Sequence, residues 1–348
     1  MNNYDGVVLM NLGSPLSTAV SDVHRYLIQF LMDRRVIDYP WLFRKVLVGG
    51  LIVPRRAPKS AEAYKTIWTE NGSPLIVISR ALRGAVQQEV QAPVEMAMRY
   101  GVPTVTDAFT SLEEKVPGIK RVLAIPLYPH YAMSSYETAV EHARESHRAG
   151  GFRFKLDFIK PFYREENYIH SLAEQIRPYL EMEHDHILFS YHGVPGRHIR
   201  KSDPTGNHCL QSATCCENPS PAHHTCYRHQ VLTTTRMVCE KLQISPASHS
   251  VSFQSRLGKG WLEPFTDKRL IEMPGEKIKK LLIVCPAFVS DCLETLEEIA
   301  IRGRASFLAA GGERFHMIPC LNTSPDWVKT LAGWIRDYAG GRERMLLS

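Results

Sequence analysis

Two short segments of the chain carry side chains that can bind a metal ion or move a proton. His192 stands in the motif Ser-Tyr-His-Gly-Val-Pro at 190–195, directly after an apolar stretch that predicts a strand. Asp291 and Glu294 follow a second such stretch. An imidazole accepts protons near neutral pH, and one nitrogen with one or two carboxylate oxygens suits Fe(II) without holding it irreversibly. These three residues are therefore candidates for a site that handles ferrous iron and protons.

Both segments also have a purely structural interpretation. His192 is equally consistent with a histidine that hydrogen-bonds its own loop. Asp291, with Glu294 three residues later, fits a capping box, which needs no catalytic role and which position alone favours. The local pattern leaves both interpretations open.

A cysteine-rich segment at 203–229 interrupts the alternation of apolar stretches with a run of Cys, His, Pro, Ser and Thr. Four thiolates are the donor set of an iron–sulfur cluster. Zinc comes next because histidines lie nearby, although close Cys-x-x-Cys pairs are missing. Disulfides come last, since two of the cysteines are adjacent and we expect a reducing compartment. The residues are Cys209, Cys215, Cys216 and Cys226, with His208, His223, His224 and His229.

The other cysteines do not form such a group. Cys239, Cys285 and Cys320 sit in apolar-periodic contexts, and we expect them in the core.

The charge balance narrows the class of partner. The chain has 42 Lys and Arg against 36 Asp and Glu, a net charge of +6 and a pI of about 8.8. This suits an anionic small molecule, a nucleic acid or an acidic membrane surface. A nucleic-acid-binding module is disfavoured, because residues 203–230 hold only Arg228 as a Lys/Arg cation and Tyr227 as an aromatic.

A basic cluster lies beside an apolar stretch at 46–53 and comprises Arg55, Arg56 and Lys59. It is either a solvated turn or a site for carboxylates at the mouth of an apolar pocket, where Arg makes paired charge-assisted bonds.

Strands alternate with helices along the chain. We expect strands at 6–13, 121–127, 187–190 and 280–286. We expect one helix capped by Ser21-Asp22, one that follows a capping box at 134–137 and runs to about 147, and two more at 293–299 and 326–338. This alternation predicts an α/β fold with parallel sheets, in which ligands bind beyond the carboxyl ends of the strands.

Length and rhythm together predict two domains. A chain of 348 residues exceeds what one core usually holds, and both halves repeat strand, polar loop and helix. We place the first domain at 1–155 and the second at 156–325, with the cysteine-rich insertion inside it. The helix in 326–348 is a candidate to pack back on the first domain.

No basic and apolar leader opens the chain, and no window approaches the roughly 20 apolar residues of a membrane span. We therefore expect a cytoplasmic protein. The apolar segment 41–53 fits either a pocket wall or a lip that makes peripheral contact with a membrane.

Short motifs recur along the chain in a definite order: Asn-Leu-Gly-Ser-Pro at 11–15, Asp-Val at 22–23, Phe-Leu-Met-Asp at 30–33, Arg-Arg-Ala-Pro-Lys at 55–59, Gly-Ser-Pro-Leu at 72–75, Arg-Tyr-Gly at 99–101, Tyr-Pro-His-Tyr at 128–131, the His192 motif at 190–195, Gln-Ser-Arg-Leu-Gly at 254–258, Trp-Leu-Glu-Pro at 261–264, Pro-Ala-Phe-Val-Ser-Asp at 286–291 and Leu-Glu-Thr-Leu at 293–296. In this order and spacing, the chain resembles the ferrochelatase family over nearly its whole length.

The resemblance implies a lyase that inserts ferrous iron into protoporphyrin IX to form protohaem in haem biosynthesis. It implies two similar Rossmann-like domains with parallel sheets and an active-site cleft between them. The family's active-site His matches His192 and its Glu matches Glu294, both as ligands of the substrate iron, and Asp291 matches an acidic neighbour. Matches to the porphyrin pocket are Arg55, Arg56, Tyr64, Ser73, Arg99, Tyr100 and Trp261.

The resemblance also bears on the cysteines. Certain bacterial ferrochelatases hold a [2Fe–2S] cluster in an internal cysteine-rich insertion, which implies such a cluster on Cys209, Cys215, Cys216 and Cys226. One position departs from the family pattern: Cys292 stands where many members have His. Because Cys also binds Fe(II), the route by which iron or protons are guided is altered and not necessarily lost.

A rival within the same fold is a chelatase for another tetrapyrrole, for instance one that inserts cobalt. Its substrates carry more carboxylates and would need more basic residues, whereas the apolar segment 26–53 favours a hydrophobic porphyrin. A redox sensor whose cluster gates activity is compatible with a ferrochelatase. The sequence leaves open the oligomeric state and the choice between protoporphyrin and coproporphyrin, although the protoporphyrin-using branch is nearer.

Overall fold

The computed structural model describes residues 6–256 and 258–347. The N-terminal residues searched for a leader, 1–5, and Leu257 of the 254–258 motif lie outside the described residues. The chain divides into two compact units. The first unit comprises Met1–Leu127, Met133–Lys160 and Val328–Ser348, and the second comprises Tyr128–Ala132 and Pro161–Trp327.

The first unit is built on a four-stranded sheet in which every pair of neighbours is parallel. Its order is β2-β1-β3-β4, and its strands are β1 (Gly6–Gly13), β2 (Val94–Tyr100), β3 (Arg121–Pro126) and β4 (Lys155–Phe158). The central strand β1 is buried almost throughout, as its continuous apolar run predicts for a parallel strand covered on both faces. The expected strands at 6–13 and 121–127 are confirmed.

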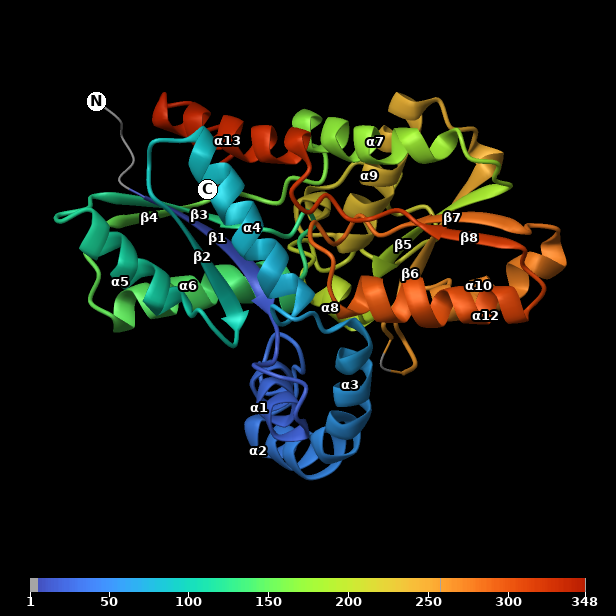
Figure 1. Ribbon diagram of the computed structural model, residues 1–348, viewed down its shortest axis with the longest axis horizontal. Coiled ribbons are helices and arrows are strands. Elements are labelled where there is room, and N and C mark those ends of the chain that lie inside the picture. The colour runs from blue at the N-terminus through green and yellow to red at the C-terminus, as the bar shows by residue number, and fades with distance from the viewer. Residues whose placement is uncertain (1–5, 257, 348) are drawn as a thin grey trace. The chain divides into compact units, whose positions relative to one another are not determined.

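A helical lobe follows the carboxyl end of β1 (Figure 1). It consists of α1 (Val20–Leu31), α2 (Trp41–Lys45), the π-helix η1 (Val46–Ile52) and α3 (Val53–Ile67). The remaining helices of this unit are α4 (Pro74–Glu89), α5 (Val105–Lys115), the π-helix η2 (Met133–Glu137) and α6 (Thr138–Ala149). The last helix, α13 (Pro325–Ala339), contributes Tyr338 to the first unit, where its Oη donates to Asp157 and accepts from Arg121 Nη2 at 2.9 Å.

Two predicted helix caps are wrong in position. Helix α1 begins at Val20 after Ala19, one turn earlier than a cap at Asp22 requires, and Asp22 instead binds Ser17 Oγ and Arg25 Nη2 at 2.6 Å each. Residues 134–137 form no capping box, because they already belong to the π-helix that runs into α6. In both cases the helix has started before the polar residue, so no free N–H groups remain for it to cap.

The second unit repeats the architecture. Its sheet has the order β6-β5-β7-β8, all parallel, with β5 (His186–His192), β6 (His249–Gln254), β7 (Lys280–Val284) and β8 (Arg314–Met317). The expected strands at 187–190 and 280–286 are confirmed, except that β5 runs two residues further, so that His192 is its last residue. Two four-stranded parallel sheets within α/β units confirm the predicted fold class.

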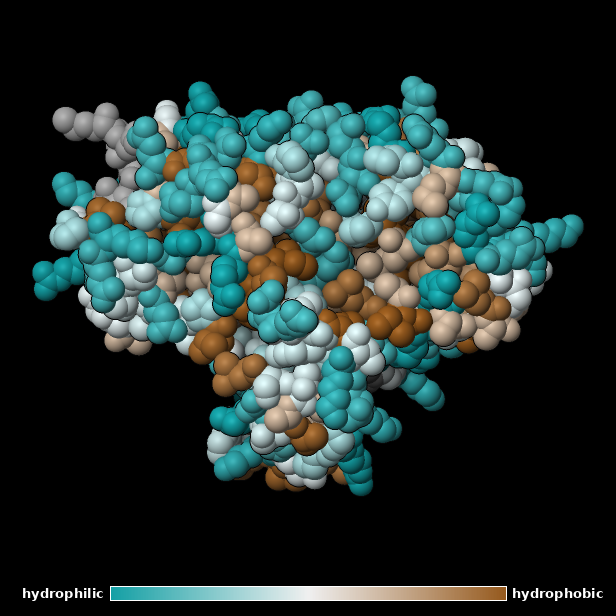
Figure 2. All heavy atoms as spheres, in the orientation of Figure 1, coloured by the Kyte–Doolittle hydropathy of each residue, from teal (hydrophilic) through white to brown (hydrophobic). Residues whose placement is uncertain are grey.

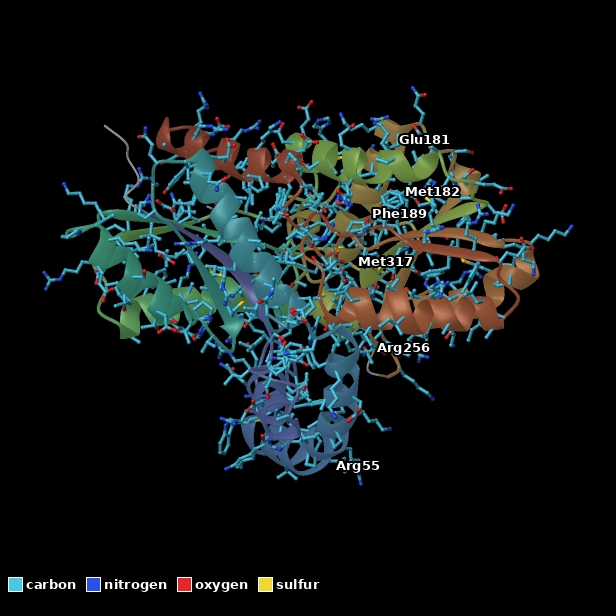
Figure 3. All side chains as sticks on the ribbon, in the orientation of Figure 1. Arg55, Glu181, Met182, Phe189, Arg256 and Met317 are labelled. Atoms are coloured by element: carbon cyan, nitrogen blue, oxygen red, sulfur yellow. The ribbon has the colours of Figure 1, made fainter. Side chains whose placement is uncertain are left out.

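Helices flank this second sheet: α7 and α9 lie on one side, and α10 and α12 on the other (Figure 1). Figure 3 labels Phe189 of β5, which is buried in the core, and Met317 of β8, which is partly buried and packs against it. The elements are α7 (Glu166–Leu180), α8 (Gly196–Lys201), η3 (Pro221–His224), α9 (Tyr227–Leu242), η4 (Pro246–Ser248), α10 (Thr266–Glu272), η5 (Met273–Glu276), α11 (Leu293–Thr295), the π-helix η6 (Leu296–Gly303) and α12 (Arg304–Ala309).

None of the helices in the described ranges combines the length and the apolar character that crossing a bilayer demands.

Candidate active site

The carboxyl ends of three neighbouring strands in the second sheet bring the candidate residues together. His192 ends β5, Gln254 ends β6 in register with it, and Glu294 follows β7. Strands of a parallel sheet share one carboxyl edge, which is where such folds bind their ligands. The second unit therefore gathers an imidazole, an amide and carboxylates at one edge.

The hydrogen bonds of His192 determine which ring nitrogen carries the proton. Its Nδ1 lies 2.6 Å from the carbonyl oxygen of Gly193. A carbonyl can only accept, so Nδ1 carries the hydrogen and, in the neutral ring, Nε2 holds the free lone pair. The structural interpretation of His192 thus accounts for one nitrogen and leaves the other available for a proton or a metal.

Gln254 connects the segments that carry His192 and Glu294. Its side chain accepts from Ser190 Oγ at 2.7 Å and donates to the carbonyl of Glu294 at 2.7 Å, and its own carbonyl accepts from Gly193 N at 2.7 Å. A Cβ at Gly193 would lie 2.8 Å from that carbonyl oxygen and 3.2 Å from the Trp261 ring, so the close approach requires glycine. Sequence reasoning missed Gln254, although its place at a strand end was a usable signal.

A third carboxylate, Glu298, accompanies Glu294. Ser255 donates to it from both its N–H and its hydroxyl, and holds a left-handed backbone with φ of 63°. Burial raises the pKa of Glu298, and the nearby charge of Glu294 raises it further, against the opposing effects of Ser255 and His192. Sequence reasoning missed this residue too, although residues four apart on a helix lie on the same face.

Asp291 occupies a different environment. Its carboxylate is buried and accepts from Thr295 Oγ1 at 2.8 Å, Asn322 Nδ2 at 2.7 Å and Cys320 N at 3.4 Å. The capping box predicted from Asp291 and Glu294 is wrong, because the N-cap of α11 is Cys292 and its partner is Thr295. Asp291 therefore braces the loop before the helix, with its oxygens already engaged.

Cys292, the residue that departs from the family pattern, contacts Glu294 directly. Its sulfur accepts from the backbone N–H of Thr295 and lies within hydrogen-bond reach of the Glu294 carboxylate. Burial raises the pKa of the Cys292 thiol well above its usual value, and the charge of Glu294 acts in the same direction. The thiol is therefore neutral and can donate to that carboxylate. Cys239, Cys285 and Cys320 are buried, which confirms their predicted place in the core.

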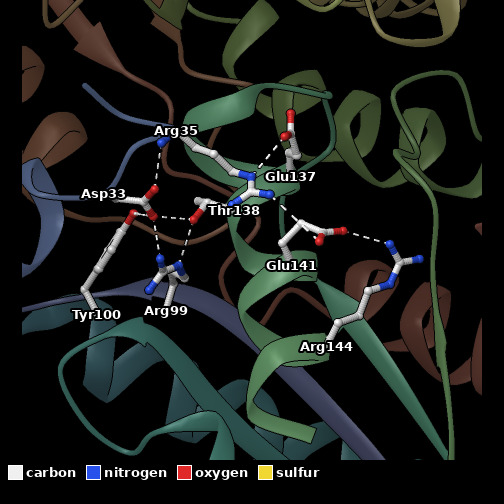
Figure 4. A network of polar contacts seen from close by, with 8 residues as sticks. All are labelled: Asp33, Arg35, Arg99, Tyr100, Glu137, Thr138, Glu141 and Arg144. Carbon is white, nitrogen blue, oxygen red and sulfur yellow. Dashed lines mark hydrogen bonds and ion pairs between the residues drawn. The ribbon is translucent and has the colours of Figure 1, made fainter. Parts of the chain in front are cut away.

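In the first unit, Arg99 and Tyr100 are joined by a carboxylate that sequence reasoning did not select (Figure 4). Asp33 accepts from Arg99 Nη2 and Thr138 Oγ1, and from Tyr100 Oη at 2.9 Å. Burial alone would raise the pKa of Asp33, but the hydrogen bonds from Thr138 and the Arg35 backbone, with the charge of Arg99, lower it. Asp33 is thus held as a carboxylate at neutral pH and fixes the orientation of Arg99.

The other predicted pocket residues are spread over both units. Arg55 is exposed near the start of α3 on the helical lobe (Figure 3), and Arg56 is half-buried beside it. Tyr64 and Ser73 are buried in the first unit. Trp261 belongs to the second unit and pairs with Pro195, next to the His192 loop. Arg99 and Tyr100 are joined through their shared contact with Asp33.

The lobe also exposes apolar side chains, and hydrophobic atoms emerge on it among hydrophilic ones (Figure 2). Trp41, Leu42, Phe43 and Val46 are each more than half exposed. Lys45 lies over the Trp41 ring at 5.0 Å from its centre. These four side chains form an exposed apolar patch on α2 and at the start of η1.

The four cysteines of the insertion converge in the second unit and form no disulfide. Cys226 is within hydrogen-bond reach of both Cys216 and Cys209, and Arg228 Nη1 lies 3.6 Å from the sulfurs of Cys215 and Cys216. The hydrogen bond from Cys216 is the main cause that lowers the pKa of Cys226 to about 6, which makes it a thiolate near neutral pH.

The histidines of this segment bind its backbone. His208 Nε2 and His223 Nε2 lie 2.7 and 3.4 Å from the Cys215 carbonyl, and His229 Nδ1 lies 3.0 Å from that of Cys216. The rings of His223 and His229 stack at 3.6 Å. Asp203 accepts from the N–H groups of His208 and Cys209 at 2.9 and 2.8 Å. Each of these histidines thus uses one ring nitrogen to hold the backbone around the cysteines.

Within the described ranges, no three His, Cys, Asp or Glu side chains are arranged around one metal ion. A [2Fe–2S] cluster does not require this, because its two irons divide four thiolates into two pairs. Four convergent thiols, one of them already a thiolate, next to a guanidinium fit that group better than a single zinc ion.

Comparisons with known proteins relate this chain to ferrochelatases. The ferrochelatase family model matches residues 4–339. A ferrochelatase of Pseudomonas syringae pv. tomato is 47% identical over 93% of this chain and 95% of its own length. A ferrochelatase of Opitutus terrae is 47% identical over 97% of this chain and 99% of its own.

A solved structure shares the fold at low identity. SirB from Bacillus subtilis with Fe3+ is 12% identical, with a TM-score of 0.53 over 79% of this chain and 95% of its own. The family match and the close relatives confirm the resemblance read from the motifs. The chain therefore belongs to the ferrochelatase family, the porphyrin metal chelatases that insert iron into protoporphyrin in haem synthesis.

Proposed function

We propose that the chain inserts ferrous iron into protoporphyrin IX with His192 as the base that accepts the pyrrole protons. The observation that carries this assignment is the hydrogen bond from Nδ1 to the Gly193 carbonyl, which leaves Nε2 unprotonated in the neutral ring. Two pyrrole N–H protons leave for each Fe2+ bound, so the charge of the metal offsets that of the deprotonated ring, and the products are protohaem and two protons. A positioned base of this kind contributes roughly 10²–10⁴-fold to the rate.

Glu294 and Glu298 receive those protons and meet the incoming iron. The raised pKa of Glu298 supports this role, because a carboxyl group with a pKa nearer to neutral exchanges protons more readily with an imidazole. Cys292 donates to Glu294 and orients it. Asp291 is a positioning residue, since Thr295, Asn322 and Cys320 already occupy its oxygens.

The porphyrin pocket is proposed to use Arg55, Arg56, Tyr64, Ser73, Arg99, Tyr100 and Trp261. Trp261 is supported by its ring lying next to Gly193. Arg99 offers no free charge, because Asp33 neutralises it, so its part is that of a rigid wall. Exposed Arg55 is the better candidate for a porphyrin carboxylate.

The test is anaerobic conversion of protoporphyrin IX and ferrous iron to haem, followed by the porphyrin absorption spectrum. We expect the wild-type chain to convert it and His192→Ala to lose nearly all activity. Full activity of Glu294→Ala would return that residue to a structural role. A folded wild-type protein that converts only coproporphyrin, or inserts only cobalt, would replace the substrate or the metal in this proposal.

We also propose that Cys209, Cys215, Cys216 and Cys226 hold a [2Fe–2S] cluster. Bound there, the group supplies one-electron redox chemistry, and no step of iron insertion is assigned to it. The convergence of four thiols beside Arg228 and the lack of a Cys-x-x-Cys pair favour this cluster over zinc.

Iron and acid-labile sulfide per chain, with the visible spectrum, test this cluster. We expect Cys216→Ser to lose the chromophore, and Cys239→Ser, whose buried thiol lies outside the segment on α9, to keep it. Zinc without sulfide in the wild-type protein would refute the assignment.

A last proposal concerns the apolar patch on α2 and η1, which we assign to peripheral contact with a membrane surface. Its exposed aromatic and aliphatic side chains next to Lys45 suit the boundary between headgroups and acyl chains. Co-sedimentation with anionic vesicles tests it. Leu42→Ser with Phe43→Ser should weaken binding, whereas Ile301→Ser, an exposed apolar residue of the second unit, should not.

A further inference from the structure

The first turn of α9 faces two sites at once. Its N-cap Cys226 and its residues Arg228 and His229 contact the cysteine-rich segment. The Cys226 sulfur accepts from His229 N at 3.5 Å, and Arg228 Nη1 lies near the sulfurs of Cys215 and Cys216. The residue between them, Tyr227, turns the other way. Its Oη donates to the backbone carbonyl of His192 at 2.8 Å.

The hydrogen bond between Tyr227 and the His192 carbonyl lies among tightly packed aromatic rings. Tyr227 is buried, and its ring meets His130 edge to face at 5.9 Å. His130 in turn meets Tyr191, the neighbour of His192 in β5, at 5.5 Å. A hydroxyl on a ring held in this way cannot follow the carbonyl if α9 shifts, so a displacement of the helix end breaks the bond.

We propose that Tyr227 is a positioning residue for iron insertion, which ties the peptide of His192 to the cysteine-rich segment. The inference rests on the proposed roles of His192 and of the four cysteines. When the sulfur ligands are in place, Cys226 fixes the start of α9 and Tyr227 holds the His192 carbonyl. When the bound group is lost, Cys226 still accepts from His229 N, but only hydrogen bonds between thiols tie it to Cys209 and Cys216, so the start of α9 and the His192 backbone are held less firmly.

Linkage makes the coupling reciprocal. If occupancy of the cysteine site favours one position of His192, then a ligand that favours the same position must act back on the cysteine site. Porphyrin bound near His192 should therefore change a spectroscopic property of the cluster without touching it.

The experiment uses the full chain, purified anaerobically with its cluster. Tyr227→Phe removes only the hydroxyl. The matched control is Tyr136→Phe, which removes a buried hydroxyl that also donates to a backbone carbonyl at 2.8 Å, that of Ile159 in the first unit. Iron and sulfide content, the visible circular dichroism of the cluster during titration with protoporphyrin IX, and the dependence of kcat on pH are measured for each.

We expect both variants to keep the cluster. Protoporphyrin should alter the visible circular dichroism of the wild-type protein and of Tyr136→Phe, and this response should fall at least about threefold in Tyr227→Phe. Loss of one buried hydrogen bond should lower kcat about fivefold to tenfold in Tyr227→Phe and shift its pH profile. Unchanged response, kcat and pH profile in Tyr227→Phe would overturn the proposal.

A second measurement decides the question if Tyr227→Phe does not fold. Amide hydrogen exchange in the wild-type protein is compared before and after the cluster is removed with a chelator. We expect exchange at 190–195 and at the start of α9 to rise at least about tenfold, while β1 in the first unit stays unchanged. Unchanged exchange at 190–195 would overturn the coupling.

These outcomes separate the inference from the proposals beneath it. A wild-type chain that makes haem but binds no cluster would refute the cluster and the coupling together. A chain with cluster and activity, in which Tyr227→Phe behaves as Tyr136→Phe, would refute the coupling alone.

Discussion

The two parallel sheets share one strand order, yet the carboxylates near their carboxyl ends behave in opposite ways. In the first unit, Asp33 is bound by Arg99, Tyr100 and Thr138, and its pKa is lowered. In the second unit, Glu298 is bound by the neutral Ser255 and lies near Glu294, and its pKa is raised. Burial raises the pKa of both groups; hydrogen bonds from Thr138 and the Arg35 backbone, with the charge of Arg99, outweigh it at Asp33, whereas those from Ser255 do not at Glu298, where the charge of Glu294 adds to the rise.

This difference matches a division of labour. A carboxylate locked to an arginine is suited to hold side chains in place, whereas a carboxyl group with a raised pKa is suited to exchange protons. The following experiments test whether proton chemistry is confined to the second unit.

The largest expected effect is that of His192→Ala. Removing the base should lower kcat by roughly 10²–10⁴-fold while porphyrin still binds, because only the proton acceptor is lost. Initial rates of haem formation and porphyrin fluorescence quenching measure the two quantities. His170→Ala, a partly exposed histidine of α7, is the control and should keep full activity. Less than tenfold loss in His192→Ala would assign the base to another residue.

Asp33→Asn should have the next largest effect, on stability. The substitution removes the negative charge that pairs with the Arg99 guanidinium, and the Arg99 side chain is only 14% exposed. Breaking a buried pair in this way costs about 3–5 kcal/mol of unfolding free energy. Urea denaturation measures it, with Glu62→Gln as the control, whose exposed pair with Lys65 should contribute less than about 1 kcal/mol. If both variants lowered the free energy of unfolding equally, the Asp33 network would not stabilise the fold more than an exposed ion pair does.

Glu298→Gln should lower kcat about tenfold, since an amide cannot relay a proton from His192. It should also remove a group from the acid limb of the profile of kcat against pH. Steady-state kinetics over a range of pH measure both. The matched variant is Glu297→Gln at the preceding residue, which pairs with Arg302 and should leave both kcat and the profile unchanged. If Glu298→Gln does likewise, the raised pKa has no catalytic consequence.

The smallest effect is the most direct test of the contrast, because the two carboxyl groups should give stability opposite slopes with pH. In the folded protein the pKa of Glu298 lies above its ordinary 4.5. Between these two pKa values the folded state binds more protons than the unfolded state, so the free energy of unfolding falls as pH rises through this range. Asp33 has a folded pKa below 3.8, so its contribution is present above 3.8 and is lost as pH falls further.

Urea titrations of the wild type, Glu298→Gln and Asp33→Asn from about pH 3 to about pH 8 would show both slopes. As pH rises above 4.5, the free energy of unfolding of the wild type should fall relative to that of Glu298→Gln. As pH falls below 3.8, the advantage in unfolding free energy of the wild type over Asp33→Asn should shrink. Slopes of the same sign would remove the distinction between the two units.

Sequence reasoning recovered the strands with long apolar runs and missed the rest. β1 and β5 are continuous and buried, whereas β2 contains Glu95 and Arg99, and β4 and β8 have only four residues each. Short or mixed segments carry too little periodicity to be told from loops. The predicted helix caps failed for a related reason, because a local motif cannot show that a helix has already begun.

The residues of the candidate site likewise fall into those that a local pattern reveals and those that it does not. His192, Glu294 and the four cysteines were selected because their types and their places after strands or in a cluster are visible locally. Asp33, Gln254, Glu298 and Tyr227 were not selected: Gln254 at a strand end and Glu298 four residues after Glu294 gave only weak local signals, and Asp33 and Tyr227 resemble ordinary polar residues in their immediate sequence. Each of them acquires its role from a partner in another element.

By itself, the sequence determined the α/β class and the positions of the imidazole and the thiols, which follow from residue type, periodicity and spacing, and the order of its motifs carried the resemblance to the family. Only the tertiary structure decided which nitrogen of His192 is free, in which direction the pKa values of Asp33 and Glu298 shift and which helix supports His192. The physical reason is that these properties depend on contacts across long separations, such as 66 residues between Asp33 and Arg99, 43 between Ser255 and Glu298 and 35 between His192 and Tyr227. Hydrogen bonds and charges act through space at a few ångströms, and no local pattern records which distant residue will lie there.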